Sequence, residues 1–201
     1  ENNIKNLATP SMDSLTSLNE LENSNPLPEA GTNKIYSVVE NIIKNKVSHL
    51  QCTPSLMRIL INDDNTRNEL KWLKKIMLGG EKLPLELIKK INAVSEAEIF
   101  NMYGPTETTV WSSVKKIDKQ ATRITLGSPI DNTQFYILDS FLNPVSEGML
   151  GELYIGGKGV TAGYINRPAL TEEKFIKNPF SDEYNLIYRT GDLVRYDSNN
   201  E

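Results

Sequence analysis

One turn of the sequence gathers side chains that could handle a nucleotide. Residues 101–111 read NMYGPTETTVW. Tyr103 offers a flat ring for a purine, and Thr106 offers a hydroxyl and an amide N–H for a phosphate oxygen. Glu107 offers a carboxylate for Mg²⁺, which usually binds through one or two carboxylates together with nucleotide phosphates. The turn alone allows two interpretations, a nucleotide and metal site or an ordinary strand-to-loop connection with a hydrogen-bonded tyrosine.

The residues before this turn predict a parallel α/β sheet, because apolar residues alternate between helical and strand spacing with short connections. The expected helices cover residues 36–46, 54–63, 66–73 and 85–95, and the expected strands cover residues 47–53, 74–78 and 97–103. In such sheets ligands bind outside the carboxyl ends of the strands. Two of these ends carry glycines, Gly79-Gly80 and Gly104, which let a ligand lie against bare backbone.

After Glu107 the pattern changes to strands separated by turns. We expect strands at residues 109–117, 133–139, 151–157 and 186–197, and one helix at residues 167–176. The predicted fold class is therefore α/β, with parallel α/β layers followed by a mainly β portion.

Composition excludes several other classes of protein. The chain has 201 residues, and its net charge of -4 gives no reason to expect a nucleic acid or an acidic membrane as partner. The single cysteine, Cys52, allows no internal disulfide, and with one histidine, His49, a zinc site is not expected. We expect Cys52 to be a small packed side chain and not a nucleophile. With no long apolar stretch and no signal-peptide core, a cytoplasmic protein is predicted.

Two further stretches can be combined with the turn. Residues 151–168, GELYIGGKGVTAGYINRP, place five glycines around a strand, and residues 188–193, YRTGDL, present Asp192 beyond a glycine. In this order, NMYGPTE, GELYIGGKGVTAGY and YRTGDL strongly resemble three core motifs of the adenylate-forming superfamily. They are most similar to the amino-acid adenylation domains of nonribosomal peptide synthetases. The resemblance runs from about Val47 to the C-terminus and implies part of the large subdomain of the adenylate-forming fold.

The resemblance implies a role for each matching residue. Tyr103 would stack on adenine, Asn101 would frame the nucleotide and Asp192 would bind the ribose hydroxyls. Thr106 would hold the α-phosphate and Glu107 the Mg²⁺, and these two are the residues implied for catalysis. The implied nucleotide-binding residues are Gly79, Gly80, Glu81, Asn101, Tyr103, Gly104, Thr106 and Asp192.

The family's side-chain pocket can be aligned at six positions. They are Ser55, Met77, Gly79, Met102, Val110 and Trp111. Trp111 and the two methionines would fill much of the pocket, and none of the six is charged. A small uncharged amino acid, glycine or alanine, is therefore expected. The alternative is that Trp111 packs into the core and points away.

The implied reaction is the ATP-dependent formation of an aminoacyl-adenylate and pyrophosphate. The acyl group then passes to the phosphopantetheine thiol of a partner carrier domain, among neighbouring synthetase domains. The family's phosphate loop and C-terminal lid do not match any part of this chain. We therefore expect residues 1–34 to be a linker or junction and residues 35–201 to be a partial adenylation domain, inactive alone.

The sequence also allows two other functions. One is an acyl-CoA or aryl-acid ligase, which would differ in its thiol acceptor. The other is a non-catalytic domain that keeps the fold for docking a carrier domain, and it would not bind Mg·ATP.

Overall fold

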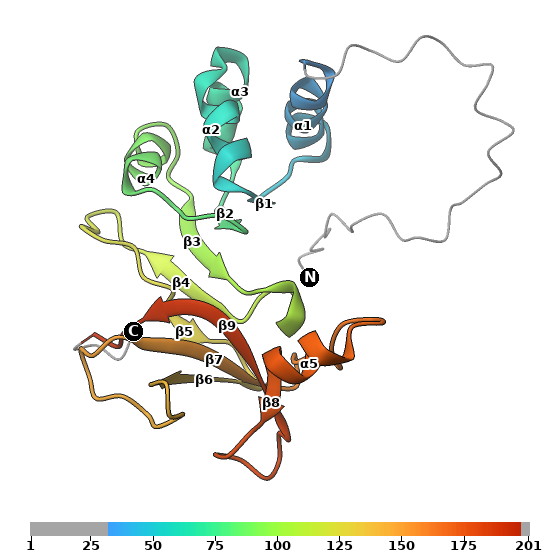
Figure 1. Ribbon diagram of the computed structural model, residues 1–201. Helices are drawn as coiled ribbons and strands as arrows, with labels where there is room; N and C mark the ends of the chain where they lie inside the picture. Colours follow the sequence, from blue (N-terminus) through green and yellow to red (C-terminus); the bar gives the residue numbers. More distant parts are fainter. Residues whose placement is uncertain (1–31, 198–201) are drawn as a thin grey trace, which may run out of the picture.

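The computed structural model describes residues 32–197, which form two β-sheets (Figure 1). The first sheet has the strand order β1 (His49–Cys52), β2 (Lys75–Gly79), β3 (Glu98–Tyr103), β4 (Ser113–Ile117) and β5 (Ser128–Pro129). Its first three strands are parallel, and β4 and β5 continue it in antiparallel pairing. The parallel register aligns Met77 with Phe100 and Gly79 with Met102, so β2 and β3 end side by side.

Helices cover one face of the first sheet. They are α1 (Thr32–Asn45), α2 (Pro54–Asn62), α3 (Asp64–Glu69), the 3₁₀ turn η2 (Leu70–Trp72) and α4 (Leu85–Asn92). Beneath them Ile76, Leu78 and Ile99 are buried among apolar helix residues. Because side chains alternate across a strand, Met77, Gly79 and Met102 belong to the opposite face. The face that carries the predicted substrate pocket is thus separate from the helix-covered core.

The second sheet is antiparallel and lies at the other end of the molecule from α1–α4 (Figure 1). Its strand order is β6 (Thr133–Leu138), β7 (Gly151–Gly157), β9 (Leu186–Val194) and β8 (Phe175–Lys177). A short helix, α5 (Pro168–Lys174), precedes β8. Leu138, Tyr154 and Ile187 form its buried cluster.

The predicted α/β class is confirmed, with differences in detail. The change of pattern after Glu107 does not coincide with a change of sheet, because β4 and β5 extend the parallel sheet. The helix expected at residues 167–176 ends at Lys174, since Phe175 is buried and pairs with Tyr188 in β8 and β9. The strand expected from residue 109 begins at Ser113.

Helix α1 begins at Thr32, three residues inside the segment predicted as a junction, and residues 1–31 lie outside the described part. Cys52 packs against the helix-covered core, and burial raises the pKa of its thiol to about 12, against a smaller opposite effect of the Met57 backbone. A thiol that stays protonated at neutral pH agrees with the expected packing role. Among residues 32–197 no helix is long and apolar enough to cross a bilayer.

Candidate functional site

A cavity of about 930 Å³ lies between the ends of the parallel strands and the second sheet. Its walls come from the turn after β2, the end of β3, the loop at residues 123–127 and strand β9. Six of the eight predicted nucleotide-binding residues line it, namely Gly80, Glu81, Asn101, Tyr103, Gly104 and Asp192. The structure therefore brings together residues from three separate sequence stretches.

Strand alternation gives β3 two functional faces. Asn101 and Tyr103 share the face of the buried Ile99, whereas Met102 belongs to the face of Met77 and Gly79. Asn101 is 6% exposed, and its amide donates a hydrogen bond to the carbonyl of Thr125 at 2.8 Å. That bond ties the loop at residues 123–127 to β3 at the cavity wall.

Tyr103 and Asp192 contact each other directly. The Tyr103 hydroxyl donates a 2.6 Å hydrogen bond to Asp192 Oδ2, and the Tyr103 ring meets Phe135 edge-on at 6.5 Å between centroids. Burial, followed by the hydrogen bond and charge of Asp192, raises the pKa of the Tyr103 phenol well above its usual value. The phenol therefore remains a donor, and the two residues predicted for adenine and ribose share one corner of the cavity.

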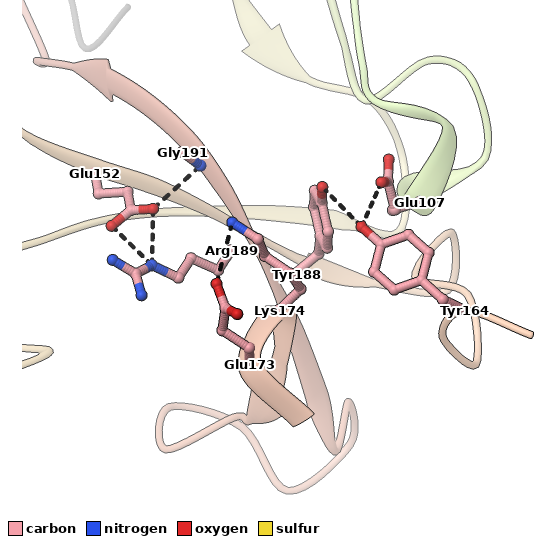
Figure 2. A network of polar contacts seen from close by, with 8 residues as sticks. All are labelled: Glu107, Glu152, Tyr164, Glu173, Lys174, Tyr188, Arg189 and Gly191. Carbon is pink, nitrogen blue, oxygen red and sulfur yellow. Dashed lines mark hydrogen bonds and ion pairs between the residues drawn. The ribbon is translucent and has the colours of Figure 1, made fainter. Parts of the chain in front are cut away.

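Glu107 lies on the 3₁₀ turn η3 (Thr106–Thr108), directly after Pro105, which lines the cavity. Its carboxylate accepts a 2.6 Å hydrogen bond from the Tyr164 hydroxyl, which lies 3.5 Å from the Tyr188 hydroxyl (Figure 2). Partial burial acts to raise the pKa of Glu107, but the hydrogen bonds from Tyr164, from its own backbone amide and from Tyr188 together outweigh it, with a smaller contribution from the charge of Lys174, so the pKa is lowered. Glu107 is thus held ionised.

Thr106, the second predicted catalytic residue, is more exposed to solvent than Glu107. Thr106 is exposed, and neither Thr106 nor Glu107 nor Gly79 lines the cavity itself. Within residues 32–197 no three acidic, histidine or cysteine side chains gather as around a protein-held metal. A single ionised carboxylate fits a Mg²⁺ ion that arrives with nucleotide phosphates, since such ions keep few protein ligands.

The predicted substrate-pocket residues lie near the ends of β1–β3. The Trp111 ring covers Gly79, because a Cβ at Gly79 would lie 2.4 Å from the ring. Trp111 is half-buried and outside the helix-covered core, so it does not pack into that core. Ser55, in contrast, donates from its amide and hydroxyl to Glu81 at 3.1 and 2.5 Å. A charged carboxylate therefore adjoins one of the six uncharged positions.

Of the predicted pocket positions, Val110 lies within and Trp111 directly follows a strained stretch of backbone at residues 109–110. Thr109 and Val110 have φ values of 64° and 72°, which β-branched side chains rarely adopt. The Thr109 hydroxyl donates a 2.6 Å hydrogen bond to the carbonyl of Gly159, and the amide of Thr161 donates to the carbonyl of Glu107 at 2.9 Å. A Cβ at Gly159 would lie 2.8 Å from the Thr108 carbonyl, so this close contact needs a glycine. Strain of this kind occurs where the surrounding structure holds it, often at functional sites.

Residue-by-residue reasoning did not single out three side chains that support the site, Tyr164, Tyr188 and Thr190. All three lie within the quoted motifs GELYIGGKGVTAGY and YRTGDL. Their partners, however, come from other strands and loops, as with Tyr164 and Glu107, which are 57 residues apart. The sequence motifs contain these residues, but which residues they contact is visible only in the tertiary structure.

Comparison with known proteins identifies the family. The model of the AMP-binding enzyme family matches residues 27–165. This chain belongs to the AMP-binding enzyme family. The match begins inside the segment predicted as a junction, at residue 27.

The chain is similar to synthases and to solved structures of NRPS adenylation domains. Tyrocidine synthase 3 of Brevibacillus parabrevis is 40% identical over 171 residues, 83% of this chain and 3% of the synthase. The N-terminal subdomain of Klebsiella oxytoca NpsA, solved with 3-hydroxyanthranilyl-AMSN, has a TM-score of 0.74 at 27% identity, covering 88% of this chain and 42% of that one. An artificially fused adenylation–PCP di-domain, NpsA-ThdA of Klebsiella oxytoca, has a TM-score of 0.75 at 27% identity, over 88% and 35% of the two chains.

These likenesses confirm the resemblance to adenylation domains and the assignment to the large subdomain of their fold. The chain spans a small part of tyrocidine synthase 3 and less than half of the NpsA subdomain. What the whole protein does is therefore a matter for proposal.

Proposed function

We propose that this chain is part of an amino-acid-activating adenylation domain. In this proposal the domain binds Mg·ATP, forms an aminoacyl-adenylate and pyrophosphate, and loads a carrier domain. The membership of the AMP-binding family and the 40% identity to tyrocidine synthase 3 support it. The NpsA-ThdA di-domain supports a carrier domain as partner, since it joins an adenylation domain to a PCP domain.

One observation carries the proposal, the cavity corner where Tyr103 and Asp192 meet. An aromatic ring and a carboxylate lie 2.6 Å apart, on the wall of a cavity of about 930 Å³. That volume falls within the usual range for small-molecule sites, roughly 300–1,000 Å³. A ring for the base and an acceptor for ribose hydroxyls at this separation suit a nucleoside.

Adenylate formation depends on a hydrogen-bond donor and a metal ion at the α-phosphate, and not on a covalent nucleophile of the protein. A substrate carboxylate oxygen attacks the α-phosphorus, a new P–O bond forms, and the bond to the β-phosphate oxygen breaks to release pyrophosphate. Thr106 would donate to the α-phosphate and Glu107 would hold Mg²⁺. The ion would neutralise charge on the phosphate oxygens as the bond breaks. In the second half-reaction the phosphopantetheine thiolate attacks the acyl carbon and AMP leaves.

The pocket supports a small uncharged amino acid, such as glycine or alanine. Trp111 covers Gly79 on the face away from the core, and Met102 lies beside Gly79 in the register of β2 and β3. Large side chains at a pocket wall leave little room for a substrate side chain.

Activation of an aromatic acid is the second candidate. It is favoured by the likeness to NpsA, which was solved with a 3-hydroxyanthranilyl ligand. We rank it lower because Trp111 reduces the space above Gly79.

Substrate-dependent exchange of labelled pyrophosphate into ATP tests both candidates. The full-length protein that contains this chain is screened with the standard amino acids and 3-hydroxyanthranilate. Exchange with glycine or alanine that disappears in Glu107→Ala supports the proposal. Exchange with 3-hydroxyanthranilate alone supports the second candidate. No exchange by a folded protein that also fails to bind Mg·ATP indicates a non-catalytic docking domain.

A further inference from the structure

Strand β9 contains a bulge beside the cavity. Its register with β7 pairs Arg189 with Tyr154 and Leu193 with Glu152. Between these pairs β9 carries three residues, 190–192, where β7 carries Leu153 alone. Gly191, in the middle, has a φ of 85°, which glycine adopts without steric cost. Bulges of this kind redirect side chains next to active sites, and this one carries Asp192.

Polar contacts from β7 hold the bulge in place (Figure 2). Glu152 Oε1 accepts from the Gly191 amide at 3.1 Å, and both carboxylate oxygens accept from Arg189 Nε at 2.9 and 3.0 Å. The Thr190 hydroxyl donates to the Leu153 carbonyl at 2.7 Å and accepts from the Asp192 amide at 3.0 Å. Each of the three bulge residues is therefore tied by a hydrogen bond.

Asp192 depends on this support because packing does not hold it. The residue is exposed, and its carboxylate reaches the cavity where it accepts from Tyr103. The Glu152 side chain, in contrast, is 18% exposed, and its contacts join the strand before the bulge to the centre of the bulge. The Asp192 carboxylate is thus held by its bond from Tyr103 and by a bulge whose backbone Glu152 and Thr190 fix.

We propose that Glu152 and Arg189 are positioning residues that aim Asp192 at the ribose hydroxyls of the nucleotide. This inference rests on the proposed function, since it assigns Asp192 to the ribose of ATP. The pair therefore sets how strongly the site prefers ATP to a nucleotide that lacks a ribose hydroxyl.

A second pair of side chains in this chain provides a matched control. Glu98 on β3 forms an ion pair with Lys116 on the neighbouring strand β4. Like Glu152 and Arg189, these two are a carboxylate and a cation on adjacent antiparallel strands and do not themselves line the cavity, but they lie away from the bulge that carries Asp192. A purely structural role of a cross-strand pair would affect the two sites alike.

Calorimetric titration of the full-length protein with ATP and with 3′-deoxy-ATP measures this preference directly. We compare the ratio of the two dissociation constants in the wild type, Glu152→Gln, Glu98→Gln and Asp192→Asn. A hydrogen bond to a charged group is worth roughly tenfold or more in affinity, so the wild type should prefer ATP by about that factor. Glu152→Gln and Asp192→Asn should lose most of this preference, and Glu98→Gln should keep it.

The possible results distinguish the positioning role of Glu152 and Arg189 from the ribose-binding role of Asp192. If Asp192→Asn loses the preference and Glu152→Gln keeps it, the positioning role is wrong and the proposed function stands. If the wild type binds ATP no better than 3′-deoxy-ATP, the ribose role of Asp192 is wrong, and the positioning role falls with it. If Glu152→Gln does not fold, Arg189→Gln replaces it, with Lys116→Gln as its matched control. Arg189→Gln should lose the preference and Lys116→Gln should keep it, and equal ratios in the two would overturn the inference.

Discussion

The helix-covered parallel sheet and the antiparallel sheet differ in what fixes their side chains. Between α1–α4 and the first sheet lies one large apolar cluster, in which Met57, Leu70, Ile76 and Leu78 are fully buried. The cluster centred on Leu138, Tyr154 and Ile187 in the second sheet is smaller. Around it, hydrogen bonds join β7 to β9, and the bonds of Tyr164 to Glu107 and of Tyr103 to Asp192 connect this half to the site.

This difference separates what stabilises the fold from what orients the side chains of the site. Burial is non-directional and stabilises whatever is packed, whereas hydrogen bonds fix distances and angles. We therefore expect substitutions of buried apolar side chains in the parallel layer to act mainly on unfolding. Substitutions of side chains around the site should act on binding or on the pH dependence of stability. Four predictions test the comparison, in order of expected effect.

Leu78→Ala should have the largest effect, because Leu78 is fully buried in the parallel layer. Removing a buried leucine side chain costs roughly 3 kcal/mol of unfolding free energy. Urea unfolding of the full-length protein measures this cost. Met77→Ala, on the opposite and half-exposed face, is the control and should cost less than half as much. Equal costs would show that burial does not distinguish the two faces.

Trp111→Gly should act on specificity. Opening the space above Gly79 should move the preference toward larger apolar amino acids by about tenfold or more, since each methylene-sized difference is worth roughly 1–3 kcal/mol. Pyrophosphate exchange with glycine, alanine, valine and leucine measures the shift. Trp72→Gly removes an exposed tryptophan far from the pocket, 64% exposed on η2, and should leave the preference unchanged. An unchanged profile in Trp111→Gly would contradict the assignment of the pocket.

Thr109→Val should weaken the strained turn at residues 109–110. The change removes the hydroxyl that donates to Gly159 and keeps the shape of the side chain. We expect a loss of about 1 kcal/mol in unfolding free energy. The KM for the amino acid should rise above its wild-type value by more than the KM for ATP does. Thr109→Ser keeps the hydroxyl and should behave like the wild type. If the serine variant is as impaired as the valine variant, the hydrogen bond is not what holds the turn.

Tyr164→Phe should have the smallest effect, and it should depend on pH. Because the folded-state pKa of Glu107 is lowered, this carboxylate adds stability above its unfolded pKa and loses it as the pH falls through the folded value. Without the Tyr164 hydroxyl the pKa should move up, so stability should fall less steeply from pH 7 to low pH. Thermal unfolding across this range measures the slope.

The control for that slope is Tyr196→Phe. The Tyr196 hydroxyl donates to the backbone carbonyl of Phe135 and not to a carboxylate. Its loss should lower stability by a similar amount at every pH. A wild-type slope in Tyr164→Phe would show that the hydrogen bond does not lower the pKa of Glu107.

Much of the parallel layer could be predicted from local pattern. Helix α2 follows the expected start, with Pro54 in its first turn and the Thr53 side chain accepting from the Leu56 amide at 3.2 Å. Strand β8, with three residues, is too short to show alternation, so the sequence pattern predicts the end of a helix there. The pattern predicts strand at Thr109 and Val110, which have left-handed backbone in the structure, because β-branched residues normally favour extended backbone.

The candidate site could be predicted as a set of residues but not as an arrangement. The motifs brought Tyr103, Glu107 and Asp192 to attention separately, and the resemblance related them through a nucleotide. Their mutual contacts depend on the packing of one sheet against the other. The bond between Ser55 and Glu81 likewise crosses 26 residues and carries no local signal.

The bond between Tyr103 and Asp192 has a consequence for folding. Its partners are 89 residues apart and belong to different sheets, so it has one of the longest sequence separations in the site. Non-local contacts form late, after the loop-closure entropy has been overcome by other pairings. ATP should therefore slow unfolding and bind poorly to partly folded intermediates. Nucleotide protection against proteolysis would then report that both sheets have docked.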